Sequence, residues 1–173
     1  VIAEENAGRL PVVLGIGGNN TAQVIHDLAT LSYLRLGDAI LSVTPYYNKP
    51  SQEGIYQHYK AISEATDLPI VLYNVPGRTG VNMKAETTLR IARDFKNVIA
   101  IKEASGDITQ MDDIIKNKPA NFDVISGDDG ITFPLITLGA VGIISVIARI
   151  QSYGAFGITR RLPKCTDNSS QIC

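Results

Sequence analysis

One lysine of this sequence stands where an amine could act as a nucleophile. Lys102 closes the apolar run Ile99-Ala100-Ile101-Lys102, and an ammonium group at the end of a buried strand loses part of its hydration. Because desolvation disfavours the charged form, it lowers the pKa of the amine and frees it to attack a carbonyl carbon. The alternative is a structural lysine whose stem is buried while its ammonium group reaches solvent.

Two further side chains could serve such an amine. Tyr73 lies 29 residues before Lys102, at the matching point of the preceding repeat. Its phenol is therefore expected near the amine, where it could carry protons to and from a carbinolamine; a buried tyrosine with a satisfied hydroxyl is the alternative. Arg78 lies shortly after Tyr73 in the sequence and could pair with a substrate carboxylate through two parallel hydrogen bonds. It could equally be a solvated loop arginine.

The elements that must position these residues are short apolar segments rich in β-branched residues. They start at intervals of 19 to 30 residues along the chain. Near-continuous apolar strands of this kind are typical of a parallel sheet covered on both faces. The predicted strands are residues 12–15, 40–43, 70–73, 99–102, 124–126 and 143–146.

Helical patterns separate these strands. Ser51 can cap a helix that carries Glu53 in its first turn, and Ile55, Tyr59 and Ile62 then fall on one face. Strands that alternate with helices indicate an α/β fold. A doubly wound sheet fits 173 residues, whereas a (β/α)₈ barrel typically needs about 250 residues, so length alone favours the sheet.

Composition excludes several classes of function. Hydrophobic residues make up 45% of the chain and charged residues 19%, with a net charge of −1. This balance does not indicate binding to nucleic acid or to an anionic membrane, and no apolar run reaches the roughly 20 residues that a spanning helix needs. The two cysteines, Cys165 and Cys173, offer no metal-ligand spacing. A cytoplasmic location is expected.

Four segments with polar ends follow the predicted strands. They are Val43-Thr44-Pro45-Tyr46-Tyr47-Asn48-Lys49-Pro50-Ser51-Gln52-Glu53-Gly54, Leu72-Tyr73-Asn74-Val75-Pro76-Gly77-Arg78-Thr79-Gly80, Ile101-Lys102-Glu103-Ala104-Ser105-Gly106 and Ser126-Gly127-Asp128-Asp129. Together they resemble the dihydrodipicolinate synthase family, within the N-acetylneuraminate lyase superfamily of class I aldolases. The resemblance runs from about residue 6 to residue 148 in the order and spacing of that family.

The resemblance implies a partial (β/α)₈ TIM barrel and so favours the barrel over the doubly wound sheet. Residues 1–148 would supply strands 3–8 of the family's barrel, while the first two strands and the C-terminal helical region would be missing. Residues 149–173 depart from the family's pattern and have little helical periodicity. We expect them to form a disordered tail, and we hypothesise that a frameshift produced it.

The resemblance also implies a reaction. Lys102 would form an imine with pyruvate, and the resulting enamine would attack aspartate semialdehyde, in the biosynthesis of lysine and diaminopimelate. Tyr73 would be the proton shuttle, Arg78 would bind the carboxylate of the second substrate, and Tyr47 would reach across a dimer interface into a neighbouring site. The imine accepts the electrons, so no metal or organic cofactor would be required. The backbone positions that line the pyruvate pocket would be Gly127 and Ile144.

Two alternatives to a synthase remain open. The sequence Arg78-Thr79-Gly80 resembles the synthase more than the sialic-acid lyase, but N-acetylneuraminate lyase or another 2-oxo-acid aldolase is the second interpretation. The third is a non-catalytic fragment of the synthase, because the family's threonine-bearing loop has no counterpart here. A homo-oligomer, either a dimer or a tetramer, is expected from the resemblance.

Three other features suggest sites but are better explained structurally. The stretch Gly15-Ile16-Gly17-Gly18-Asn19-Asn20 places Asn20 where a dinucleotide fingerprint needs its third glycine. Asp128 and Asp129 lack further ligands at metal spacing, so we predict a turn and a helix cap. His26 and His58 are expected on the surface of separate helices.

Overall fold

The computed structural model describes residues 5–146 of the chain. Within them, six parallel strands form one sheet in the order β1-β2-β3-β4-β5-β6. The predicted tail, residues 149–173, lies outside the described residues. The strands are β1 (Val13–Gly15), β2 (Ala39–Val43), β3 (Ile70–Asn74), β4 (Val98–Glu103), β5 (Asp123–Ser126) and β6 (Gly142–Ile143).

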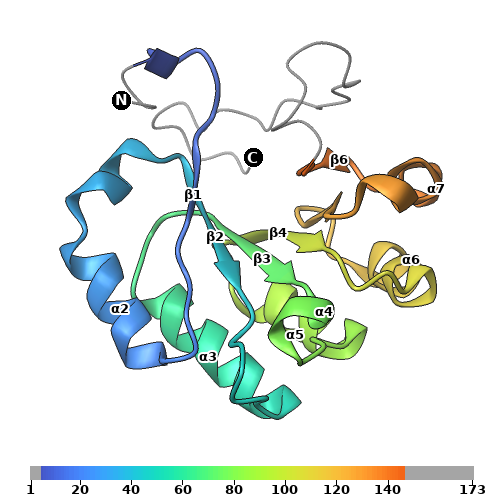
Figure 1. Ribbon diagram of the computed structural model, residues 1–173, viewed down its shortest axis with the longest axis horizontal. Coiled ribbons are helices and arrows are strands. Elements are labelled where there is room, and N and C mark those ends of the chain that lie inside the picture. The colour runs from blue at the N-terminus through green and yellow to red at the C-terminus, as the bar shows by residue number, and fades with distance from the viewer. Residues whose placement is uncertain (1–4, 147–173) are drawn as a thin grey trace.

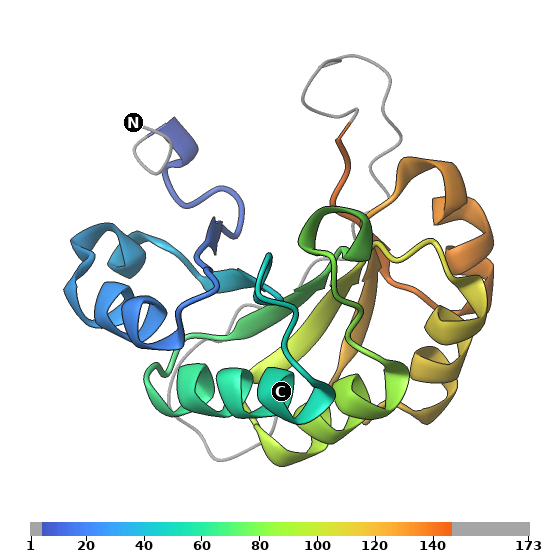
Figure 2. The same cartoon turned by 60° about the horizontal axis from the view of Figure 1, so that its bottom comes forward.

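Helices alternate with these strands and cover one face of the sheet. The sheet curls into an arc with the long helices along its outer side (Figure 1, Figure 2). The helices are α2 (Thr21–Thr30), α3 (Gln52–Glu64), α4 (Pro76–Thr79), α5 (Ala85–Asp94), α6 (Ile108–Asn117) and α7 (Thr132–Leu138), with 3₁₀ turns η1 (Ser32–Leu36) and η2 (Asp129–Ile131).

Strand order and helix placement decide between the two predicted architectures. A doubly wound sheet reverses its strand order at a switch point and carries helices on both faces. Here neighbouring strands follow the chain, and the helices lie on one side, as in a barrel. The partial (β/α)₈ barrel is therefore confirmed.

The core lies between the sheet and its helices. Alternate side chains of a strand point to opposite faces, and one set packs under the helices. Ile40, Leu72, Ile101 and Val124 from four adjacent strands are fully buried there. Ile55, Tyr59 and Ile62 of α3 are also fully buried, which confirms the predicted apolar face of that helix.

Helix starts follow the sequence signals. The Ser51 hydroxyl accepts a hydrogen bond from the Gly54 amide at 3.1 Å, so the predicted cap is confirmed. Asn20 and Asp107 cap α2 and α6 in the same way. Each cap satisfies an amide that has no partner inside its helix, which stabilises the start by about 1 kcal/mol. No helix of residues 5–146 is long and apolar enough to cross a membrane.

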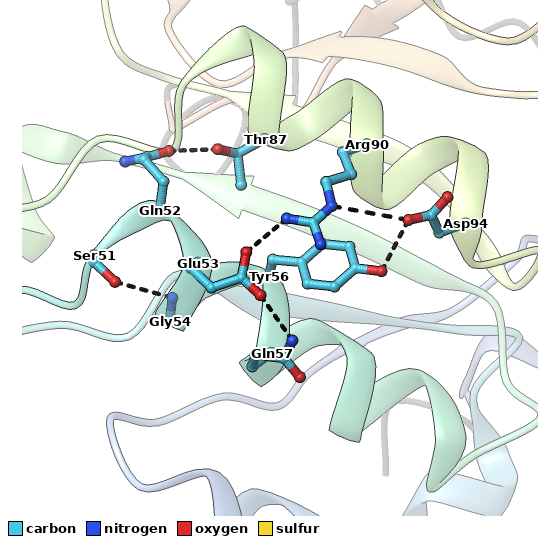
Figure 3. Close-up of polar contacts among 9 residues, drawn as sticks. All are labelled: Ser51, Gln52, Glu53, Gly54, Tyr56, Gln57, Thr87, Arg90 and Asp94. Carbon is cyan, nitrogen blue, oxygen red and sulfur yellow. Dashed lines mark hydrogen bonds and ion pairs between the residues drawn. The ribbon is translucent and has the colours of Figure 1, made fainter.

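A polar cluster holds α3 to α5 on the outer surface. Figure 3 shows the guanidinium group of Arg90 over the ring of Tyr56, between two carboxylates. The Arg90 carbon Cζ lies 3.5 Å from the ring centroid, and Nη1 lies 2.6 Å from the Glu53 carboxylate. The Tyr56 hydroxyl donates to Asp94 at 2.8 Å. Stacking and ion pairing therefore act on the same guanidinium group.

Two predictions about single elements are wrong. The sixth strand spans only Gly142–Ile143 rather than residues 143–146, because Asp129 accepts hydrogen bonds from the Ser145 hydroxyl and the Val146 amide, which draw the chain off the ladder. His58 is buried, with 3% of its surface exposed. Its Nδ1 pairs with the Thr21 hydroxyl at 2.8 Å, joining α2 to α3. His26 is exposed, as expected.

Candidate active site

The carboxyl ends of the central strands bring the predicted catalytic pair together. Tyr73 on β3 and Lys102 on β4 are register partners, and Val43 on β2 and Ile125 on β5 continue the same row. Partners in a parallel ladder share one face, and in this row that is the face away from the helices. The predicted adjacency of Tyr73 and Lys102 is therefore confirmed.

Lys102 is held out of water. Only 8% of its surface is exposed, and its Nζ lies 4.2 Å from the centroid of the Tyr73 ring. Burial lowers the pKa of the amine, and the positive charge of Arg78 lowers it further, while the negative charge of Asp129 opposes both. The predicted desolvation is confirmed and the solvent-reaching alternative is wrong. At a given pH, more of this amine is neutral than in an exposed lysine.

The amine contacts the face of the Tyr73 ring. A cation over an aromatic face is attracted by about 0.5–2 kcal/mol, so the ring holds the amine in place in its charged form. The backbone of Tyr73 is also fixed, because its carbonyl accepts hydrogen bonds from the Thr44 amide and hydroxyl, both at 3.0 Å. The residue that follows β2 thus helps to hold the backbone from which the Tyr73 ring projects.

Arg78 lies in the short helix that follows β3. Pro76 begins α4, and Gly80 ends it with a φ of 75°, a left-handed conformation that glycine adopts without strain. The Arg78 side chain is exposed. Its charge nevertheless acts on the amine of Lys102, so both lie at the same end of the sheet. An exposed guanidinium group near a buried amine can bind an incoming carboxylate.

Gly127 leaves the space that Lys102 occupies. A β-carbon at this position would lie 2.8 Å from Cβ of Ala104 and 3.0 Å from Cε of Lys102. The Gly127 amide donates to the Glu103 carbonyl at 2.8 Å, and the Ile144 amide donates to the Ser126 carbonyl at 2.9 Å. The structure thus places Gly127 against Lys102, and Ile144 just beyond the neighbouring strand β6.

Tyr47 stands apart from the buried pair. Its side chain is 87% exposed, and its φ of 73° is unusual for a residue other than glycine. The loop is held by a hydrogen bond from the Tyr47 amide to the Thr79 carbonyl at 3.1 Å. The ring is thus presented to the outside of this chain.

The paired aspartates act as structural groups. Asp128 accepts from the Gly130 amide at 2.8 Å and so caps η2, as predicted. Asp129 binds the chain after β6. Within residues 5–146, no cluster of three or more histidine, cysteine, aspartate or glutamate side chains is arranged to hold a metal ion.

The comparison with known sequences decides the family. The sequence model of the Dihydrodipicolinate synthetase family matches residues 1–169. The chain belongs to this family. The 4-hydroxy-tetrahydrodipicolinate synthase of Parabacteroides distasonis is 79% identical over 140 residues, which cover 81% of this chain and 47% of the relative. That of Phocaeicola vulgatus is 75% identical over 147 residues, covering 85% of this chain and 49% of the relative.

Solved structures of the dihydrodipicolinate synthetase family share the fold. The dihydrodipicolinate synthase of Thermotoga maritima superposes with a TM-score of 0.81 at 49% identity, covering 85% of this chain and 50% of that one. The enzyme of Bacillus anthracis also gives 0.81, at 45% identity, covering 86% and 50%. The chain therefore spans about half the length of the relatives and structures it matches.

The sequence patterns did not predict a pair of buried polar residues that lie on the opposite face of β3 and β4 from Tyr73 and Lys102. Glu103, the residue after Lys102, is fully buried, and so is its register partner Asn74. A carboxylate and an amide at the ends of adjacent apolar strands could have indicated the pair. Their further partners, Asn82 and Gln110, lie on other segments, and no local pattern reveals them.

Proposed function

We propose that this chain carries the imine-forming part of a 4-hydroxy-tetrahydrodipicolinate synthase, a lyase that condenses pyruvate with aspartate semialdehyde. One observation carries the proposal: the amine of Lys102 is buried at the carboxyl ends of the strands, over the ring of Tyr73. The curated relatives that match the chain bear the name of this synthase. The reaction belongs to lysine and diaminopimelate biosynthesis.

Lys102 begins the proposed reaction. Its neutral amine attacks the keto carbon of pyruvate and forms a carbinolamine, which loses water to give an imine. Loss of a proton from the methyl group gives an enamine, and its carbon attacks the aldehyde of the second substrate. In this proposal Tyr73, whose ring lies beside the amine, exchanges protons with the departing hydroxyl group. The protonated imine accepts the electrons, so the proposed steps need no metal or organic cofactor.

Arg78 and the two backbone positions would hold the substrates. The guanidinium group is exposed at the same end of the sheet. There it can bind the carboxylate of aspartate semialdehyde through two parallel hydrogen bonds. Gly127 has no side chain and so leaves room for the Lys102 side chain. Ile144 directly follows β6. In this proposal both line the pyruvate pocket through their backbone.

Tyr47 would act in a neighbouring copy of the chain. A tyrosine that is 87% exposed and held in a left-handed conformation is costly to maintain unless another surface covers it. We place it across a dimer interface, where its phenol joins the proton relay of the partner's site. A homo-oligomer in the cytoplasm is the expected setting.

Exchange of the methyl protons of pyruvate in D₂O tests the proposal. Enamine formation replaces methyl hydrogen by deuterium, which proton NMR follows without the second substrate. We expect exchange with the chain, none with Lys102→Arg, and slower exchange with Tyr73→Phe. Lys116→Arg, on an exposed helix face, is the matched control. Exchange that survives in Lys102→Arg would contradict the assignment.

Adding the second substrate separates the alternatives. Pyruvate consumption with aspartate semialdehyde supports the synthase, whereas pyruvate release from N-acetylneuraminate supports the lyase. A folded chain that gives neither exchange nor turnover supports the non-catalytic fragment.

A further inference from the structure

Two of the proposed catalytic residues are each followed by a fully buried polar residue. Asn74 follows Tyr73 on β3, and Glu103 follows Lys102 on β4. Because successive side chains of a strand alternate between faces, these two point toward the helices while the catalytic pair points away. Asn74 and Glu103 are register partners and have no exposed surface. The two pairs therefore stand back to back across the same two strands.

The Glu103 carboxylate joins three segments of the chain. It accepts hydrogen bonds from the Ser105 amide at 2.7 Å and from the Asn74 side chain at 3.1 and 3.2 Å. A third donor is the Gln110 side chain of α6, at 3.2 Å. The carboxylate thus fixes the turn after β4 to β3 and to α6.

Asn74 extends this network to the loop that follows α4. Its side-chain carbonyl accepts from the Met83 amide at 3.0 Å, and its amino group donates to the Asn82 side chain at 2.8 Å. Asn82 in turn donates to Gln110 at 2.8 Å. The segment between Arg78 and α5 is therefore anchored to the same buried carboxylate.

Thr79 carries the connection to the remaining site residues. Directly after Arg78, its hydroxyl donates to the Val81 carbonyl at 2.9 Å, two residues before Met83. Its own carbonyl accepts from the Tyr47 amide at 3.1 Å. The backbones that carry Lys102, Arg78 and Tyr47 are thus connected by these hydrogen bonds and by the short chain segment from Thr79 to Met83.

Burial of a carboxyl group at this position is unfavourable in free energy. Burial raises the pKa of Glu103, while hydrogen bonds from Asn74, Ser105 and Gln110 lower it again. Removing a carboxylate from water is unfavourable in proteins, and its hydrogen bonds offset only part of that penalty. An apolar residue would pack the same position at less cost, so a role beyond packing is needed to explain it.

We infer that Glu103 is a positioning residue: through Asn74, Asn82 and Gln110 its buried side chain fixes the end of β4 and the Arg78 segment, and so holds the Lys102 amine in its desolvated place. The inference rests on the proposed function for its chemical meaning. A displacement of about 1 Å can reduce a rate about 100-fold, so a network that sets this position controls imine formation.

Two variants of Glu103 separate positioning from charge. Glu103→Gln keeps the shape and removes the charge, whereas Glu103→Asp keeps the charge but is one methylene group too short to span these donors. A positioning role predicts that both variants impair Lys102, and a purely electrostatic role spares the aspartate variant. Gln110→Met removes one donor to Glu103 together with the hydrogen bonds between Gln110 and the Asn82–Met83 segment, while the carboxylate and its other donors stay in place. It should act in the same direction as the Glu103 variants, which keeps the test decisive if those variants do not fold.

The first readout is the pH dependence of Lys102 acetylation by acetic anhydride, followed by peptide mass spectrometry. Looser packing rehydrates the amine, so we expect the profile to move to higher pH in both Glu103 variants and in Gln110→Met. The second readout is the rate of pyruvate trapping by borohydride at Lys102, expected to fall about tenfold or more in the Glu103 variants.

Asn97→Ala is the matched control at the other end of β4. Asn97 donates to the Ser63 and Thr66 carbonyls at 3.0 and 2.9 Å, so its loss should lower the melting temperature without moving the acetylation profile. A wild-type profile in Glu103→Asp or Gln110→Met, or an equal shift in Asn97→Ala, would overturn the inference. A wild-type chain that traps no pyruvate refutes the proposed function instead, and the acetylation profiles still decide the role of Glu103.

Discussion

Gly127 and Lys102 fit together so closely that no side chain can stand between them. A β-carbon on Gly127 would lie 3.0 Å from Cε of Lys102 and 3.2 Å from the Glu103 carbonyl oxygen. The same β-carbon would lie 2.8 Å from Cβ of Ala104. Because neither that atom nor the backbone oxygen can move without shifting the chain, the backbone at this point and the lysine side chain would both have to move. The absence of a side chain at residue 127 is therefore a condition for the observed position of the amine.

Gly127→Ala should displace Lys102 and destabilise the chain. We expect the free energy of unfolding to fall by about 1–3 kcal/mol, as for other overpacked sites, and pyruvate trapping to slow by about 100-fold. Urea unfolding and trapping kinetics measure the two effects. Gly15→Ala is the control, because a β-carbon there meets no atom within 4 Å. Unchanged trapping in folded Gly127→Ala would contradict this account.

Arg78 should tune the amine of Lys102 through its charge. Its positive charge contributes to the lowered pKa of Lys102, so Arg78→Gln should raise that pKa and leave less neutral amine at a given pH. Arg78→Lys keeps the charge and should leave the pKa nearly unchanged, although it loses two-fold carboxylate binding. The pH dependence of Lys102 acetylation measures both. Identical profiles for Arg78→Gln and wild type would show that the two groups do not interact.

His58 should make the fold sensitive to acid. Burial lowers its pKa from 6.5 to about 4, so below about pH 6.5 the unfolded chain binds a proton that the folded chain does not. Stability is therefore lost as the pH falls from about 6.5 toward 4, by up to about 3 kcal/mol. In His58→Gln that part of the pH dependence should disappear. Urea unfolding at several pH values measures it.

The control for this acid effect is His26→Gln, because the His26 side chain is exposed. This variant should keep the acid dependence of the wild type. If His58→Gln and wild type lost stability equally between pH 6.5 and 4, the buried imidazole would not be its source.

Arg90 should stabilise the contact between α3 and α5 more through stacking than through charge. Arg90→Lys keeps a positive charge near Glu53 but loses the planar group over Tyr56. We expect a lower melting temperature for Arg90→Lys, approaching that of Arg90→Ala. A melting temperature for Arg90→Lys equal to wild type would assign the effect to the ion pair alone.

Much of the fold follows from local signals. Five of the six strands lie within one residue of their predicted ends, because β-branched apolar runs between turn residues leave few other structures open. Equal spacing of the repeats also placed Tyr73 beside Lys102, since equivalent strand ends meet at one edge of a parallel sheet. The barrel itself was predicted from the family resemblance, because length favoured a doubly wound sheet.

Long-range contacts account for what the sequence did not reveal. His58 is buried because α2 packs on a second side of α3, which the periodicity of one helix does not show. Glu103 accepts from Asn74 and Gln110, and Asn82 bonds to both of these donors; all three lie on other segments. Asp129 shortens β6 by binding residues beyond it. Each depends on a partner distant in the sequence.

The central claim is that the Lys102 amine condenses with a keto acid. Borohydride reduction in the presence of pyruvate, followed by peptide mapping, tests it most directly. We predict a stable adduct on the peptide containing Lys102, absent without pyruvate and absent in Lys102→Arg. A folded chain with no adduct, or with the adduct spread over exposed lysines such as Lys96 and Lys116, would contradict the claim.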